Sequence, residues 1–503
     1  MQKIPDQPPT KTLQAAQPQA LRAYEDLPGP RGLPFFGNAL QLDLPRMHQQ
    51  LEQWSHEFGP MFKLKVPGRR LLLVSNHETV AAVLRDRPDG FSRPRKLEEI
   101  WVELGLPVGL FVANGDVWKR QRRMVMAGFD PTHVKNYYPA MVGVAQRLSA
   151  RWCRAAAAGQ AIDLQPDLMR YTVDTIAGLA FGAGVDTLSS DGDVIQQHLD
   201  QIFPALYDRL YKPLPVWRWL PSKSDKHLAH SIKQVNLAVD GFIAQARARL
   251  ALDAARRAEP PNLLEAMIVA ADEPASGMDD QQVAGNVMTM LLAGEDTTAN
   301  TLAWMLYLMW QNPSTLAKAT AEVQRLVGDS TSPTLEQMAQ LEYVEACAHE
   351  TMRLKPVAPI LVGQAMRDVM VGDVRVPKGV VVTALMRRDS VSDAHVPNAA
   401  AFEPERWLAN GDTATSAATT ANSAKRISMP FGAGPRICPG RYLALLEMKL
   451  AIATVLRDFD ITSVDTADGS PAQEVMKFAM APEGLRMRLR AKAQTKTSEA
   501  AIH

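Results

Sequence analysis

Cysteine is scarce in this chain of 503 residues, which has only Cys153, Cys347 and Cys438, far apart from one another. An odd and scattered set of cysteines supports no disulfide framework and none of the paired spacings by which cysteines hold zinc. A reducing, intracellular setting is the simpler interpretation. We therefore expect a cytoplasmic protein whose cysteines act singly where they act at all.

The sequence also lacks an excess charge of one sign and a long apolar run near its start. Lysine and arginine number 55 against 54 aspartates and glutamates, so no overall field favours nucleic acid or an anionic membrane. The first 30 residues contain no apolar run of signal-peptide length. We expect no transmembrane anchor and no nucleic-acid partner; attachment to a membrane surface stays open.

What the sequence does contain is a mostly helical pattern. Hydrophobic residues make up 46% and charged residues 22%, which is ordinary for a globular protein with a substantial core. Short β-rich pieces occur at residues 62–66, 71–74 and 374–382, the last broken by the Pro-Lys-Gly sequence at residues 377–379. These features predict a mainly α protein with small β-sheets (α+β), without the regular alternation of a parallel α/β sheet. Apolar residues at three- and four-residue spacing predict helices at residues 47–58, 141–156, 232–255, 283–310, 319–327 and 338–354.

Composition also divides the chain. Residues 1–26 are rich in proline and glutamine at their start and are expected to form a flexible leader. Residues 27–490 should form a single folded domain, entered through a stiff proline- and glycine-rich stretch at residues 27–34. Residues 491–503 are expected to be a tail, and the Ala/Thr/Ser/Asn-rich residues 410–424 a solvent loop.

The most informative segment surrounds Cys438. Three glycines and two prolines occur between Phe431 and Gly440, so this stretch is neither helix nor regular strand, but it can wrap tightly and aim amide N–H groups at the sulfur. Such donors and a following helix N-terminus favour a thiolate. Arg436 adds a cation where an anionic group can sit. The alternatives for a single cysteine are a small buried hydrophobe or a hydrolase nucleophile, but no histidine is placed in a recognisable dyad.

This segment resembles the haem-binding loop of the cytochrome P450 family, Phe-x-x-Gly-x-Arg-x-Cys-x-Gly, and matches it at every fixed position. The resemblance covers roughly residues 27–489. It implies the cytochrome P450 fold, with haem b (iron protoporphyrin IX) lying between a long central helix and the Cys loop. Cys438 would bind the iron, and Phe431, Arg436 and Gly440 would surround the cofactor.

A second motif interrupts the apolar helix predicted at residues 283–310. Its middle reads Ala-Gly-Glu-Asp-Thr-Thr from position 293, and glycine and threonine are locally costly there because threonine hydroxyls bond back to carbonyls one turn earlier. Taken alone, this is a kinked helix with a capped threonine. The stretch is similar to the family's oxygen-binding motif, which implies that Thr297 holds dioxygen or a delivery water and that Asp296 relays protons.

A third motif, Glu350-x-x-Arg353, places two charges on one helical face. Alone it is an exposed ion pair of small value. The resemblance implies instead a buried triad completed by Arg406, from the Phe-Glu-Pro-Glu-Arg-Trp stretch at residues 402–407. Its role would be to fix the fold around the Cys loop.

A fourth motif, Trp118-x-x-x-Arg122, resembles the family element that binds a haem propionate, for which the planar guanidinium of arginine is suited. The sequence departs from many relatives at Gly363, where they supply another propionate arginine. That contact is either absent or taken over by Arg367.

Together these motifs imply a monomeric haem-thiolate monooxygenase that uses O2, an apolar small-molecule substrate, and electrons from a separate ferredoxin or flavodoxin/reductase system. A locally basic face made of Lys119, Arg120, Arg123 and Arg441 is the expected docking site. The alternatives are a peroxide-driven peroxygenase and a non-oxidative isomerase, against which the Asp296-Thr297 pair argues. A binding or sensor module would have no need of that pair.

By the same resemblance, the substrate pocket would be lined by residues 100–112, 203–219, 357–362 and 478–480 together with the motif helix. These segments are mostly apolar and aromatic, which favours a lipid, terpene or aromatic compound. Arg209 or Lys212 would be placed to meet a carboxylate at the pocket mouth.

Overall fold

The computed structural model describes residues 21–129, 131–182, 185–190, 195–408 and 424–492. The predicted tail beyond residue 492, most of the predicted leader and nearly all of the predicted solvent loop lie outside this range. Within the leader, Arg22–Ala23 form β1 beside β8, and the side chain of Tyr24 is buried.

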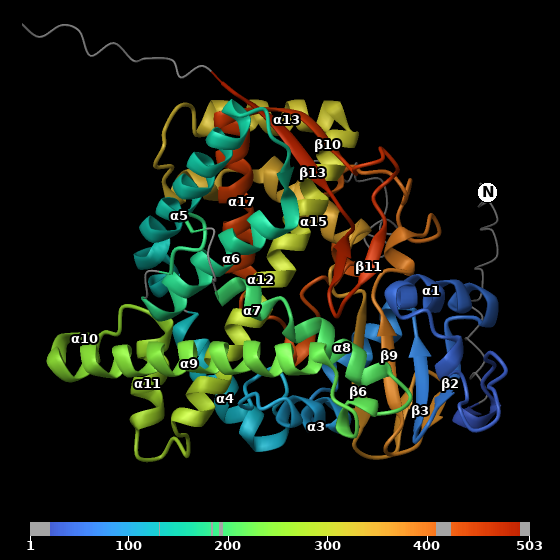
Figure 1. The fold of residues 1–503 in the computed structure, drawn as a ribbon. Helices are drawn as coiled ribbons and strands as arrows, with labels where there is room; N and C mark the ends of the chain where they lie inside the picture. Colours follow the sequence, from blue (N-terminus) through green and yellow to red (C-terminus); the bar gives the residue numbers. More distant parts are fainter. Residues whose placement is uncertain (1–20, 130, 183–184, 191–194, 409–423, 493–503) are drawn as a thin grey trace, which may run out of the picture.

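The helices surround one long central helix, α12 (Figure 1). Asp279 caps the N-terminus of α12 in a capping box, and its side chain accepts hydrogen bonds from the amides of Gln281 and Gln282. Because α12 packs against α6, α15, α17 and α9, most of its faces are buried. The helices are α1 (Met47–Phe58), α2 (His77–Arg85), α3 (Arg95–Glu103), α4 (Gly115–Gly128), α5 (Pro131–Ala157), α6 (Leu164–Phe181), α7 (Ile195–Leu199), α8 (Ile202–Tyr211), α9 (Lys223–Leu252), α10 (Ala254–Ala258), α11 (Leu263–Asp272), α12 (Asp280–Gln311), α13 (Pro313–Leu326), α14 (Leu335–Ala339), α15 (Glu342–Leu354), α16 (Ala424–Ile427) and α17 (Arg441–Asp458).

The strands form small sheets at the edge of the helical body, the largest in the order β2-β3-β9-β6-β4 (Figure 1). Other sheets have the orders β1-β8-β7, β10-β13-β5 and β11-β12. The strands are β1 (Arg22–Ala23), β2 (Met61–Val66), β3 (Arg69–Val74), β4 (Phe91–Ser92), β5 (Ile162–Asp163), β6 (Ile360–Ala365), β7 (Val369–Val371), β8 (Val374–Val376), β9 (Val381–Leu385), β10 (Phe459–Asp465), β11 (Glu474–Met476), β12 (Met480–Pro482) and β13 (Arg486–Ala491).

The predicted fold class, mainly helical with small sheets, is confirmed. Boundaries differ where long-range packing overrides local pattern. Helix α9 begins nine residues before the predicted start, where Ser222 and Asp225 form a capping box. The helix predicted at residues 338–354 divides into α14 and α15. The stretch at 374–382 forms β8 and β9 on either side of a turn with Gly379 at φ 86°, where the sequence predicts a break. In the described part of the chain, no helix has both the length and the apolar character needed to cross a bilayer.

Candidate functional site

The backbone around Cys438 is held in a tight loop before α17. The amide of Cys438 donates to the carbonyl oxygen of Phe431 at 3.0 Å. Gly434 has φ 71°, and a Cβ there would lie 2.6 Å from the carbonyl oxygen of Leu84 in α2. Only glycine fits this conformation and this close approach, so the loop is pressed against α2.

The surroundings of the Cys438 sulfur are cationic. Burial raises the pKa of the Cys438 thiol, while the amide of Gly440 and the charges of Arg122 and Arg441 oppose that rise. The groups that favour the thiolate are therefore an amide and two guanidinium groups rather than a histidine base. This arrangement suits a metal ligand better than a general-base-activated nucleophile.

A group of buried arginines lies next to this loop. Burial, together with the charges of Arg87 and Arg436, lowers the pKa of Arg93 to about 9. The pKa of Arg436 falls to about 10 through burial and the charges of Arg87 and Arg122. Among the described residues, Arg87, Arg93 and Arg436 have no carboxylate partner within ion-pair distance. Such a cluster is costly unless an anionic group joins it.

The polar atoms of these arginines show where that group would fit. Arg436 stacks over the Trp118 ring at 4.7 Å and donates to the carbonyl oxygen of Ala113 at 2.6 Å, but its buried Nε has no acceptor. Arg93 donates from Nε to the carbonyl oxygen of Phe111 at 3.0 Å. The structure thus brings Trp118, Arg122 and Arg436 together near Cys438, as the sequence motifs predict. Guanidinium donors without a carboxylate partner fit the propionates of haem b.

Arg93 was not identified from the sequence, and it bears on the position of Gly363. A Cβ on Gly363 would lie 3.2 Å from Cβ of Phe91, so the strand pairing leaves little room for a side chain there. Arg367 does not take over the contact, because its side chain is 60% exposed and lies 3.6 Å from Asp86. Arg93 follows β4, which pairs with β6, and supplies the buried cation instead.

The motif in α12 borders an apolar cavity of about 240 Å³. Thr297 Oγ1 donates to the carbonyl oxygen of Ala293 at 2.7 Å, the one-turn back-bond expected of threonine in a helix. Both residues line the cavity. The cavity lining also includes three aromatic rings in contact: Phe203 stacks on Phe478 with ring centroids 4.5 Å apart, and the ring centroid of Phe111 lies 5.9 Å from that of Phe478.

Three carboxyl groups gather beside Thr297. Burial and the charge of Asp200 raise the pKa of Asp296 to about 6, although Asn300 Nδ2 donates to it at 2.5 Å. Burial likewise raises the pKa of Asp200 to about 6 and that of Glu295 well above its ordinary value. Asp296 was predicted as a site residue. Glu295 and Asp200 were missed, since only the tertiary structure brings Asp200, the residue directly after α7, to the motif helix.

The Glu350 network is complete and buried. Arg353 donates to Glu350 at 2.8 and 2.7 Å, Arg406 Nε donates at 2.9 Å, and Trp407 Nε1 donates at 2.8 Å. Burial alone would raise the pKa of Glu350, but Arg353 and the other donors outweigh it and the pKa is lowered. The structure brings Glu350, Arg353 and Arg406 together as the sequence predicts.

Comparisons with known proteins agree with this geometry. The family model described as cytochrome P450 matches residues 27–489. The chain is 28% identical to the protein LUTEIN DEFICIENT 5, chloroplastic, of Arabidopsis thaliana, over 86% of this chain and 72% of that protein. It is 29% identical to the self-sufficient cytochrome P450 monooxygenase CYP505U2 of Exserohilum turcicum, over 93% of this chain and 42% of the relative.

A further relative is the bifunctional cytochrome P450/NADPH–P450 reductase 2 of Bacillus subtilis, at 29% identity over 86% of this chain and 40% of the relative. The chain therefore spans less than half the length of these reductase-bearing and self-sufficient relatives. A crystal structure of a cytochrome P450DA mutant haem domain superposes with a TM-score of 0.78 at 24% identity, covering 93% of this chain and 98% of that one. This likeness establishes the fold.

Proposed function

The chain belongs to the cytochrome P450 family, and on that premise we propose that it is a haem-thiolate monooxygenase that inserts one oxygen atom of O2 into an apolar organic substrate. The observation that carries the proposal is Cys438 beside buried arginines that lack a carboxylate partner. Haem b, when bound, supplies the iron for oxygen activation, and thiolate ligation favours O–O cleavage over simple oxygen carriage.

The chain's own residues have separable tasks in this proposal. Cys438 binds the iron, and Arg93, Arg436 and Trp118 orient the cofactor through its carboxylates. The apolar cavity at Thr297 holds the substrate and excludes water. Asp296, with a pKa of about 6, is mostly ionised at neutral pH, but its pKa is close enough to neutrality for its carboxyl oxygen to take up and release a proton during turnover. Thr297 Oγ1 would hydrogen-bond the dioxygen or the water molecule that receives this proton.

The cavity favours an apolar substrate, and the charges at its mouth favour one with a carboxylate. The predicted contacts through Arg209 and Lys212 are already occupied, because these side chains pair with Asp225 at 3.0 Å and Asp208 at 2.6 Å. Arg69 and Lys96 line both the apolar cavity and an adjoining mouth cavity of about 360 Å³. Neither has a carboxylate within ion-pair distance in the described part of the chain. We propose that these two cations receive the carboxylate of an amphipathic acid.

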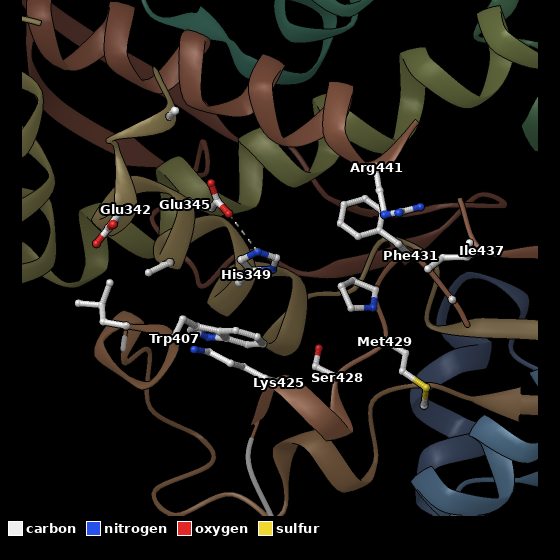
Figure 2. Close-up of a pocket in the computed structure, with 15 residues that line it drawn as sticks. Glu342, Glu345, His349, Trp407, Lys425, Ser428, Met429, Phe431, Ile437 and Arg441 are labelled. Atoms are coloured by element: carbon white, nitrogen blue, oxygen red, sulfur yellow. Dashed lines mark ion pairs between the residues drawn. The ribbon is translucent and has the colours of Figure 1, made fainter. Parts of the chain in front are cut away.

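Electrons would arrive at the face behind the Cys loop. A surface hollow of about 780 Å³ lies there, bordered by Phe431, Ile437 and Arg441 (Figure 2). Of the four basic residues predicted as a docking face, only Arg441 lines it. Across the hollow, Glu345 is paired with His349 and Lys449, which hold its pKa at about 2.

Lys425 also borders this hollow and adds a second cation to Arg441, while Glu342 and Glu345 are the carboxylates of the lining. We propose that an acidic ferredoxin or flavodoxin docks here as a separate protein, although the Bacillus subtilis relative is a bifunctional P450/reductase. Lys425→Glu should then slow haem reduction, and the effect should shrink as salt is added. Reduction at the wild-type rate at every salt concentration would contradict this docking site.

The experiment that tests the central proposal is the absorption spectrum of the dithionite-reduced, carbon-monoxide-bound protein. Wild type should show the strongly red-shifted Soret band of thiolate ligation, and Cys438→His should lose it. Cys153→Ser is the matched control, since Cys153 is exposed and should not affect the band. A wild-type protein that binds no haem, or that shows a histidine-like band, would overturn the proposal.

A further inference from the structure

A second group of candidate metal ligands lies outside the cavity and the Cys loop. His77, Asp389 and His395 each offer one ligand atom, and these three atoms lie within 4.8 Å of one another. His77 Nδ1 is 2.9 Å from Asp389 Oδ2, and His395 Nε2 is 3.7 Å from the same oxygen. The two imidazole rings meet edge to face, with centroids 5.2 Å apart. From this geometry we propose that His77, Asp389 and His395 form a binding site for a divalent zinc-type cation.

The distances between the ligand atoms suit such an ion. Bonds of about 2.0–2.2 Å to nitrogen and oxygen in a tetrahedron separate neighbouring ligand atoms by roughly 3.3–3.5 Å. The two distances to Asp389 Oδ2 lie on either side of that value, and the three ligand atoms lie within 4.8 Å of one another, so rotations of the two imidazoles toward a common centre would admit the ion. Two imidazoles and one carboxylate select zinc and similar first-row ions over Mg²⁺ and Ca²⁺, which prefer all-oxygen sites.

Two of the three side chains in the site are buried, and the third is partly exposed to solvent. The Asp389 side chain is 3% exposed and that of His77 11%, whereas that of His395 is 28% exposed. Asp389 Oδ2 also accepts a hydrogen bond from the backbone amide of His77 at 2.8 Å, and the guanidinium group of Arg388 donates a hydrogen bond to Asp389 Oδ1 at 3.1 Å. These bonds orient the carboxylate with Oδ2 toward both rings, as outer partners do in protein metal sites. Three protein ligands and an accessible side leave a fourth position for water.

The position of the site in the fold gives the ion a structural consequence. His77 is the first residue of α2, whereas Asp389 and His395 lie in the segment between β9 and Arg406. The far end of α2 supports the Cys loop, where Gly434 approaches the carbonyl oxygen of Leu84. A bound ion would therefore tie the helix that supports the Cys loop to the segment that supplies the Glu350 network. The site does not depend on the proposed reaction.

The test is calorimetric titration of chelator-treated, haem-loaded protein with ZnCl2, with MgCl2 as the control ion. Wild type should bind one Zn²⁺ per chain and should not bind Mg²⁺ there. His395→Ala and His77→Ala should each weaken Zn²⁺ binding by at least about tenfold. His56→Ala, which removes an exposed histidine of α1, should leave it unchanged. Zinc should also raise the thermal midpoint of wild type and of His56→Ala, but not that of His395→Ala.

Because Asp389 also bonds to the amide of His77, Asp389→Asn could disturb α2, and the more exposed His395 is the safer position to change. Its variant should have the wild-type thermal midpoint in the absence of zinc. X-ray absorption at the zinc edge should show nitrogen and oxygen neighbours at about 2.0–2.1 Å, including imidazole. Wild type without saturable zinc binding, or a His77→Ala/His395→Ala double variant that binds like wild type, would overturn the proposal.

Discussion

Two clusters of buried charged side chains in this protein differ in the partners that lie next to their charges. In the network of Glu350, Arg353 and Arg406, both arginines donate to the carboxylate of Glu350. Arg93 and Arg436 donate instead to uncharged backbone carbonyls. Their charged neighbours, Arg87 among them, are other cations, and the pKa values of Arg93 and Arg436 fall to about 9 and 10.

The difference separates charges that hold the fold from charges that await a ligand. A buried network that the chain completes by itself stabilises the fold only while it is complete. A buried cation that the chain leaves unmatched is costly in the free protein and becomes favourable only when an anion binds. The same reasoning applies to the three neighbouring carboxyl groups of Asp200, Glu295 and Asp296. It also applies to the two cations at the cavity mouth, Arg69 and Lys96.

The largest effect should come from breaking the complete network. Glu350→Gln would leave Arg353, which is fully buried, without its carboxylate. We expect the free energy of unfolding to fall by about 3–5 kcal/mol, measured by urea unfolding. Glu405→Gln is the control, because Glu405 pairs with Lys318 near the surface and should cost no more than about 1 kcal/mol. If both variants lost the same free energy of unfolding, the buried network would be no more important to stability than a surface ion pair.

The unmatched arginines should behave in the opposite way. Arg93→Met removes one of several like charges, so the haem-free protein should be no less stable than wild type. Haem affinity should nevertheless fall by about tenfold to a hundredfold, the value of a hydrogen bond to a charged group, measured by transfer of haem to apomyoglobin. Arg367→Met, at an exposed and paired position, should change neither quantity. A haem-free Arg93→Met protein much less stable than wild type would show that Arg93 is structural.

The cluster of carboxyl groups beside Thr297 should make the free energy of unfolding depend on pH. The pKa of Asp296 is raised to about 6 from an ordinary 3.8, so protonation stabilises the folded chain below pH 3.8 and this contribution is lost as pH rises through 6. Asp296→Asn should therefore raise the free energy of unfolding at pH 8 by on the order of 2 kcal/mol and show no gain at pH 4.

Asp468 provides the opposite case. It is exposed, and bonds from the hydroxyl and amide of Ser470 lower its pKa to about 2. Its stabilising contribution is present at neutral pH and lost in acid, so Asp468→Asn should slightly destabilise the protein at pH 8. A gain from Asp296→Asn that does not depend on pH would point to packing rather than to the buried charge.

The Cys loop could be predicted from its own residues because they lie in one short motif with fixed spacing, whereas the buried Glu350 network was predicted from the family resemblance. Three glycines and two prolines determine the shape around Cys438 locally, and Glu350 and Arg353 share one helical turn. The long α12 was predicted for the same reason, since its apolar repeat is local. The residues around Cys438 predict a thiolate by themselves, and the family resemblance adds Arg406 and Trp118 from distant segments.

The unmatched charges could not be predicted in the same way, because they are defined by what is missing around them. Arg93 is one basic residue among many in the sequence, and only the packing of β4 beside β6 buries it. Asp200 comes close to Glu295 through the packing of α7 against α6 and α9. Arg209 and Lys212 were predicted as free cations, but their carboxylate partners become visible only in three dimensions.

The smallest effect we predict is at the cavity mouth, where solvent screens the charges. Lys96→Met should weaken binding of a long-chain carboxylic acid by up to about fivefold and leave binding of its methyl ester unchanged, measured by substrate-induced spectral shifts. Burial and the charges of Arg69 and Arg218 lower the pKa of Lys96 to about 8, so the preference for acid over ester should decline as pH rises through 8. Lys212→Met should keep the wild-type preference because Lys212 is already paired with Asp208. If Lys212→Met lost the preference and Lys96→Met kept it, an unmatched charge in the free structure would not identify where a ligand's charge binds.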